Sequence, residues 1–424
     1  MNLLIKSAKI IDPNSPHNGK KVDILIEEGI IVKMKEGITE KNNTTVFEAE
    51  NLHVSPGWFD MHVNFRDPGF EYKEDLASGT KAAAYGGFTG VACMPSTLPP
   101  IHTKSEVEYI KNKTTHSIVD VYPIGALSYN LDGKDLSEMY DMHLSGAVAF
   151  SDDKKSVANP GLLCRALLYS KNFNGLIISF ADDKDISLDG KMNEGIVSTS
   201  IGLKGMPSLA EEIMIARDIF LAEYTESKIH FSTISTAMSV ALIRAAKAKG
   251  LNVTAEVSAH QLALNDSSLN DFDSNYKVNP PLRSNVDIEA LIQGLSDGTI
   301  DVICSDHSPE DEEMKKREFD HAAFGIIGLE TAFAVLSSAL HKKLTLEQII
   351  GKIAINPRKI LNLDLAVLKE GENANITFFN PSLAWTFKEN NIQSKSKNTP
   401  FIGMSFTGKA LGIYNKKQFV ECKF

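Results

Sequence analysis

Residues 56–76 read PGWFDMHVNFRDPGFEYKEDL, a short apolar run that leads into polar residues. Alternate side chains of a β-strand point to the same side, so positions 62 and 64 face the same way. A His-x-His pair at a strand end is a common opening of a catalytic zinc site. Here the pair is His62 and Asn64. The stretch therefore predicts a strand that enters a site in which one expected metal ligand is replaced.

Eight β-rich runs, of which this is the first, alternate with helical patterns. They cover residues 53–64, 87–95, 117–127, 146–153, 175–182, 228–235, 251–260 and 301–309. Such alternation is typical of parallel βαβ units, and eight units in one chain favour a closed barrel. We therefore predict an α/β fold, a (β/α)8 barrel of the TIM type. An open, doubly wound sheet is the alternative.

Two of the predicted helices begin with the spacing of a capping box, in which a Ser or Thr precedes a Glu by three positions. The pairs are Thr103 with Glu106, and Ser208 with Glu211. Both pairs predict the first turn of a helix on the outside of the barrel.

The two ends of the chain read as short strands separated by polar turns. Each end alone is too small to be a stable sheet, and pairing would cover the apolar faces of both. We predict a small β-sandwich composed of residues 1–54 and 366–424, beside a barrel of residues 55–365.

Composition excludes several classes of function. The formal net charge of −10 disfavours binding to nucleic acid or to anionic lipid. The four cysteines show no C-x-x-C spacing, which fits a reducing cytoplasm. No run approaches the roughly 18 apolar residues of a membrane helix. We expect a cytoplasmic protein without nucleic-acid or membrane partners, and a homo-oligomer, because symmetric dimers are common.

Active sites of such barrels lie at the C-terminal ends of the strands. The first strand ends in His62 and Arg66, the fourth in Asp152 and Asp153, and the eighth in Asp306. Each residue alone has an ordinary structural explanation, such as a turn or a helix cap. Their joint position on successive strand ends favours a functional site.

Several motifs together resemble dihydroorotase of the cyclic amidohydrolase superfamily. They are SPGWFDMHVNFRDPGFEYKEDL, GGFTGVACMPST, GAVAFSDD, VNPPLR, ICSDHSP, FGIIGLET and NTPFIG. The resemblance covers nearly the whole chain, and it is to the bacterial branch that has an aspartate, not a carboxylated lysine, between two metals. It implies the barrel with its sandwich, and hydrolysis of the cyclic amide of dihydroorotate in pyrimidine biosynthesis.

The resemblance also implies six metal ligands, of which three remain in this chain. They are His62, Asp306 and Asp153, with Asp152 as the alternative to Asp153. Asp306 would also be the catalytic residue that takes and returns the proton. The three other ligands, all histidines in the family, are replaced by Asn64, Phe180 and Thr233.

The substrate contacts implied by the resemblance are partly retained. The positions that match the family are Arg66, Asn279, His307 and Gly325. Ser96 stands where the family has an asparagine that holds the substrate carboxylate, and Glu310 stands where it has a histidine.

Loss of half the ligands predicts loss of catalysis, because a catalytic zinc needs about three protein ligands and Phe180 has no lone pair to donate. We expect no bound metal, or zinc on His62, Asp153 and Asp306 if the site still functions. The resemblance then implies a structural partner of aspartate carbamoyltransferase.

Two alternatives stay open. The first is an active, metal-dependent dihydroorotase that hydrolyses dihydroorotate to carbamoyl aspartate. The second is binding of a cyclic amide or ureido acid without turnover, which Arg66 and Asn279 favour.

Overall fold

The computed structural model describes residues 2–40 and 43–422, and a parallel eight-stranded sheet lies at its centre. The strands are β6 (Trp58–Val63), β7 (Phe88–Cys93), β8 (Asp120–Gly125), β9 (Ala149–Phe150), β10 (Ile177–Phe180), β13 (Ile229–Ser232), β14 (Val253–Ser258) and β15 (Val302–Cys304). They are adjacent in the sheet in this same order. Each strand falls inside one of the predicted runs, so the predicted barrel is confirmed.

The first and last strands approach each other and nearly close the barrel. Val63 forms a parallel bridge with His307, and the Asn64 N–H donates to the His307 carbonyl oxygen at 2.8 Å. Neighbouring strands all pair in parallel, so the C-terminal ends of the eight strands face one mouth.

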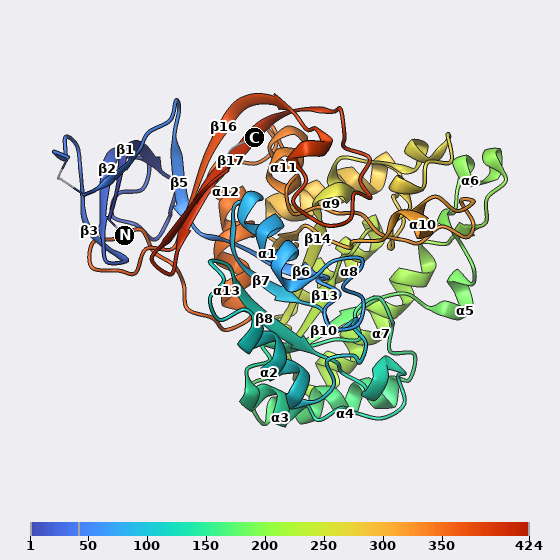
Figure 1. Ribbon diagram of the computed structural model, residues 1–424. Coiled ribbons are helices and arrows are strands. Elements are labelled where there is room, and N and C mark those ends of the chain that lie inside the picture. The colour runs from blue at the N-terminus through green and yellow to red at the C-terminus, as the bar shows by residue number, and fades with distance from the viewer. Residues whose placement is uncertain (1, 41–42, 423–424) are drawn as a thin grey trace.

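Helices surround the sheet and shield its outer face (Figure 1). They are α1 (Leu76–Tyr85), α2 (Lys104–Lys113), α3 (Met139–Ser145), α4 (Pro160–Lys171), α7 (Leu209–Thr225), α8 (Ala237–Ala248), α9 (Asn285–Asp297), α11 (Ala332–Ala339), α12 (Leu346–Ile350) and α13 (Asn356–Ile360). Short helices α5 (Lys184–Ser187), α6 (Ile196–Ile201) and α10 (Glu312–Lys315) lie in loops at the mouth. None of the helices in the described residues is long and apolar enough to cross a membrane.

One of the two predicted capping boxes forms. Thr103 and Glu106 cap α2 reciprocally, as predicted. Helix α7 begins directly after Ser208, as predicted, but no capping box forms there, because the Ser208 side chain makes no capping hydrogen bond. Glu211 instead accepts hydrogen bonds from Ser235 N at 2.8 Å and from Ser239 Oγ at 2.6 Å. Its carboxylate thus ties α7 to the turn that begins α8.

The two ends of the chain share one sheet beside the barrel. Its strands are β1 (Leu3–Ile10), β2 (Lys21–Glu27), β3 (Ile30–Lys35), β4 (Thr45–Phe47), β5 (His53–Pro56), β16 (Ile376–Thr386), β17 (Ser405–Asn415) and β18 (Gln418–Glu421). The two ends join where β5 pairs antiparallel with β16, with Val54 opposite Phe378. This sheet has its own apolar core, in which the rings of Phe47, Phe378 and Phe419 pack with centroids 5.1–5.6 Å apart. The domain boundaries at residues 54 and 366 stay a prediction.

Candidate functional site

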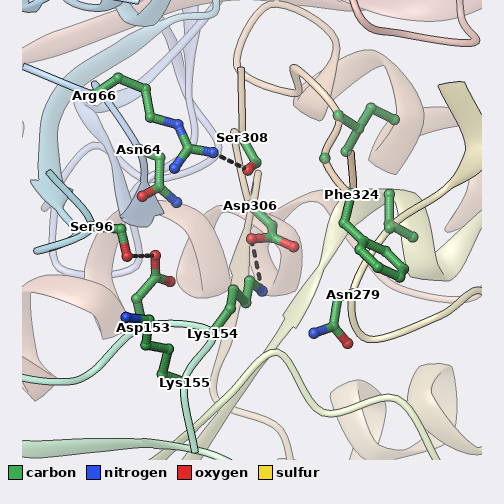
Figure 2. Close-up of a pocket in the computed structure, with 13 residues that line it drawn as sticks. Asn64, Arg66, Ser96, Asp153, Lys154, Lys155, Asn279, Asp306, Ser308 and Phe324 are labelled. Carbon is green, nitrogen blue, oxygen red and sulfur yellow. Dashed lines mark hydrogen bonds and ion pairs between the residues drawn. The ribbon is translucent and has the colours of Figure 1, made fainter. Parts of the chain in front are cut away.

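A cavity of about 260 Å³ lies at the C-terminal mouth of the barrel (Figure 2). Its wall includes, from the residues that the sequence singled out, Asn64, Arg66, Ser96, Asp153, Asn279, Asp306 and Gly325. Lys154, Lys155, Ser308 and Phe324 complete much of the remaining wall. The strand ends therefore bring together residues that lie up to 261 positions apart, from Asn64 to Gly325.

Several of these strand ends have a left-handed backbone. The φ angles are +60° at Arg66, +53° at Asp153, +42° at Thr233 and +50° at Asp306. Non-glycine residues rarely adopt this conformation, and it is concentrated at functional sites.

His62 is buried between two carboxylates. Its Nε2 donates to Asp153 Oδ1 at 3.1 Å, and its Nδ1 donates to Glu256 Oε1 at 2.8 Å. Burial and the nearby Lys154 oppose a charged imidazole, but these two hydrogen bonds outweigh them and raise the pKa of His62 to about 10. The pKa of Asp153 is lowered despite its burial, because His62 and Lys154 stabilise the carboxylate.

Asp153 and Asp152, which the sequence could not separate, have different roles. Asp153 faces His62 in the cavity, whereas Asp152 accepts hydrogen bonds from the backbone N–H groups of Leu127 and Ser128, at 3.0 and 2.8 Å. Burial raises the pKa of Asp152 to about 6. Asp152 thus holds the loop after β8 and lies outside the cavity wall.

Lys154 contacts three of the six positions at which the resemblance implies metal ligands. Its Nζ forms an ion pair with Asp306 Oδ1 at 2.9 Å and donates to Thr233 Oγ1 at 3.1 Å. The same ammonium lies 5.1 Å from the centroid of the Phe180 ring (Figure 2 shows Lys154 and Asp306). The sequence alone did not single out Lys154. Its position directly after Asp152 and Asp153 could have indicated a cation that pairs with carboxylates of the site.

The three positions at which the resemblance implies replaced ligands offer little to a metal ion. Phe180 is buried at 4% exposure, and Thr233 accepts the Lys154 hydrogen bond. Asn64 Oδ1 is buried and finds no hydrogen-bond partner among the described residues. A pair of metals does not fit this set, because the position between Asp306, Thr233 and Phe180 already holds an ammonium.

A second set of side chains lies deeper in the barrel. Ligand atoms of His62, Glu256 and Cys304 lie within 4.8 Å of one another, and all three residues are buried. These residues can hold a metal ion, so the structure lends no support to the expectation that the protein binds none. Burial raises the pKa of the Cys304 thiol well above its usual value, which disfavours the thiolate that a zinc site needs.

Three predicted substrate contacts are already engaged with other protein groups. Ser96 Oγ donates to Asp153 Oδ2 at 2.6 Å. Arg66 Nη2 donates to Glu310 Oε1 at 2.9 Å, and the other oxygen of Glu310 pairs with Lys73 Nζ at 2.6 Å. Glu310 does not line the cavity, but it forms an ion pair with Arg66, which does.

The remaining predicted contacts are divided between the cavity and the core. Asn279 and Gly325 line the cavity. Gly325 has φ +143°, and a Cβ there would lie 2.7 Å from the Ser308 carbonyl oxygen, so only glycine fits. His307 is fully buried behind the wall, where its Nε2 lies 3.5 Å from Glu74 Oε2.

Comparison with known proteins agrees with the motifs. A family model described as Dihydro-orotase-like matches residues 52–239. A dihydroorotase of Geobacter sp. (strain M21) is 43% identical over 422 residues, or 99% of each chain. A dihydroorotase of Acetivibrio thermocellus is 46% identical over 409 residues, or 96% of each chain.

Solved structures share the fold. An L-hydantoinase (dihydropyrimidinase) from Arthrobacter aurescens superposes with a TM-score of 0.84 at 22% identity, over 99% of this chain and 96% of that chain. The identity over nearly the full length of the named relatives is decisive for the family. This chain belongs to the dihydroorotase family.

Proposed function

We propose that this dihydroorotase-family protein has lost metal-dependent hydrolysis and keeps a pocket for a cyclic amide or ureido acid. The contact of Lys154 Nζ with Asp306, at 2.9 Å, carries the proposal. In the resembled site Asp306 would bind metal and move a proton, whereas here it is paired with a side-chain cation. An ammonium balances carboxylate charge but cannot lower the pKa of a bound water as zinc does.

The relatives favour the alternative, an active dihydroorotase. The matched proteins carry that name and are 43–46% identical to this chain. Asp306 is retained, and His62, Glu256 and Cys304 can hold an ion. The two hypotheses differ in metal content and turnover, and both can be measured on the purified chain.

We expect the chain, purified after growth with added zinc, to contain no stoichiometric metal and to hydrolyse dihydroorotate no faster than buffer. Elemental analysis and steady-state assays in both directions, with zinc, manganese or cobalt supplied, test this. Two metals per chain, or turnover that disappears in Asp306→Ala, would establish the active enzyme. One metal that is lost in Cys304→Ser but kept in Asp306→Ala would identify the deeper set of ligands.

Replacing Lys154 by methionine should lower the free energy of unfolding by about 1–3 kcal/mol, because Asp306 and Asp153 would keep their buried charges without this cation. Urea unfolding measures the change. The control is Lys155→Met, which removes an exposed neighbouring lysine and should change stability by less than about 0.5 kcal/mol. Equal effects of the two variants would contradict the central role of Lys154.

Restoring the three histidines should restore zinc binding only if Lys154 is also removed. The quadruple variant Asn64→His, Phe180→His, Thr233→His and Lys154→Ala should melt at a higher temperature with zinc, because zinc would bind the folded state. The triple variant that retains Lys154 is the matched control and should respond weakly. A full response of the triple variant would show that the ammonium does not compete with metal.

We also propose that the chain is cytoplasmic, forms a homo-oligomer and assembles with aspartate carbamoyltransferase. The outer face of α4 and α7 supports a protein partner. Its exposed apolar side chains are Leu168, Tyr169, Leu209, Ile213, Phe220 and Tyr224. Large apolar patches on a protein surface commonly mark interaction sites.

Light scattering after size exclusion, with the chain alone and mixed with aspartate carbamoyltransferase, tests these partners. We expect an assembly in both cases, and we expect Phe220→Glu to weaken it by placing a charge on the apolar face. Leu144→Glu on α3 is the control, since both side chains are 67% exposed. A monomer in both samples would contradict the proposal.

A further inference from the structure

Arg66 lines the cavity, and three hydrogen bonds to other protein groups engage its Nε and Nη2 atoms. Nε donates to the Pro309 carbonyl oxygen at 3.2 Å, and Nη2 donates to Ser308 Oγ at 2.9 Å. The third partner is the carboxylate of Glu310, also 2.9 Å from Nη2. A guanidinium binds carboxylates through this fork of N–H groups. Glu310 therefore uses part of the surface that a ligand carboxylate would need.

Glu310 is held in this place from several sides. Its second oxygen lies 2.6 Å from Lys73 Nζ, so two cations flank one carboxylate. Its backbone N–H donates to Asn398 Oδ1 at 3.1 Å. The side chain is only 8% exposed, which limits screening by solvent. The carboxylate is thus a fixed negative charge beside the cavity.

One unused polar group of the cavity, the side-chain oxygen of Asn64, suits an uncharged amide. Asn64 Oδ1 is a buried acceptor without a partner among the described residues, and a ring N–H could donate to it. The Asn279 side chain points into the same cavity (Figure 2). Burying a polar group without a partner is unfavourable, so a ligand that supplies the missing donor would be stabilised.

We infer that Glu310 determines ligand specificity: its ion pair with Arg66 excludes ligand carboxylates, and the cavity selects uncharged cyclic amides. The inference rests on the proposed ligand class and narrows it. Glu310 acts through Arg66 and is a positioning residue. A carboxylated ring would have to displace Glu310 from Arg66, or else place its own charge beside it.

Isothermal titration of the full chain with two ligands tests this inference. Dihydrouracil is the uncharged ring, and dihydroorotate is the same ring with a carboxylate. The unchanged chain should bind dihydrouracil more tightly. Glu310→Gln should raise the affinity for dihydroorotate roughly 10- to 100-fold, the value of a charge-assisted hydrogen bond. It should change the affinity for dihydrouracil by less than about threefold, since that ring does not need Arg66.

The matched control is Glu312→Gln, which removes an exposed carboxylate two positions away that pairs with Lys316. It should leave both affinities unchanged. If Glu310→Gln does not fold, Glu310→His replaces it and should show the same direction. An unchanged ratio of the two affinities, or no binding of either ring, would overturn the inference. So would tighter binding of dihydroorotate by the unchanged chain, lost in Lys155→Met, since Lys155 would then hold the carboxylate.

Hydrolysis is assayed in the same samples, which separates the two proposals. Turnover would refute the loss of catalysis, yet the ratio of affinities would still test the role of Glu310. If the chain shows no turnover and Glu310→Gln leaves the ratio of the two affinities unchanged, only the inference about Glu310 is refuted.

Discussion

Closure of the barrel is the constraint on which the site depends. The hydrogen bond from Asn64 N–H to the His307 carbonyl oxygen joins the first strand to the residues after the last one. It places Arg66 from one side of the closure within contact of Ser308 and Glu310 from the other. In an open sheet these residues would lie at opposite edges. Closure of the barrel therefore brings these polar residues together at the mouth, whatever reaction or ligand the site serves.

Convergence of the strand ends creates an electrostatic problem, because it buries several carboxylates near one another. A protein can solve it with a metal ion, with protonation or with a side-chain cation. This chain uses cations of its own: His62 lies between Asp153 and Glu256, and Lys154 pairs with Asp306. Under the proposed function, the Lys154 ammonium would compete with a metal ion for the space beside Asp306.

Charges are also paired within the protein at the mouth of the barrel. Arg66 is paired with Glu310, and Glu310 with Lys73. Glu310 thus shares one negative charge between two cations that could attract an anionic ligand. The backbone is left-handed at Arg66, Asp153, Thr233 and Asp306, all of which follow the ends of barrel strands.

The sequence by itself determined the eight strands, because alternation of apolar runs and helices is a local property of the chain. It also determined the family, through the motifs that it shares with dihydroorotases. Its resemblance to the family also predicted that Asn64, Phe180 and Thr233 stand at positions of metal ligands. It could not separate Asp152 from Asp153, because one residue of register reverses the direction of a side chain. It did not reveal Lys154 or the Arg66–Glu310–Lys73 pairs, and it placed His307 among substrate contacts although the residue is buried behind the wall. Only the tertiary structure decided these points, since an ion pair between residues 244 positions apart depends on barrel closure and on the space left by neighbouring side chains.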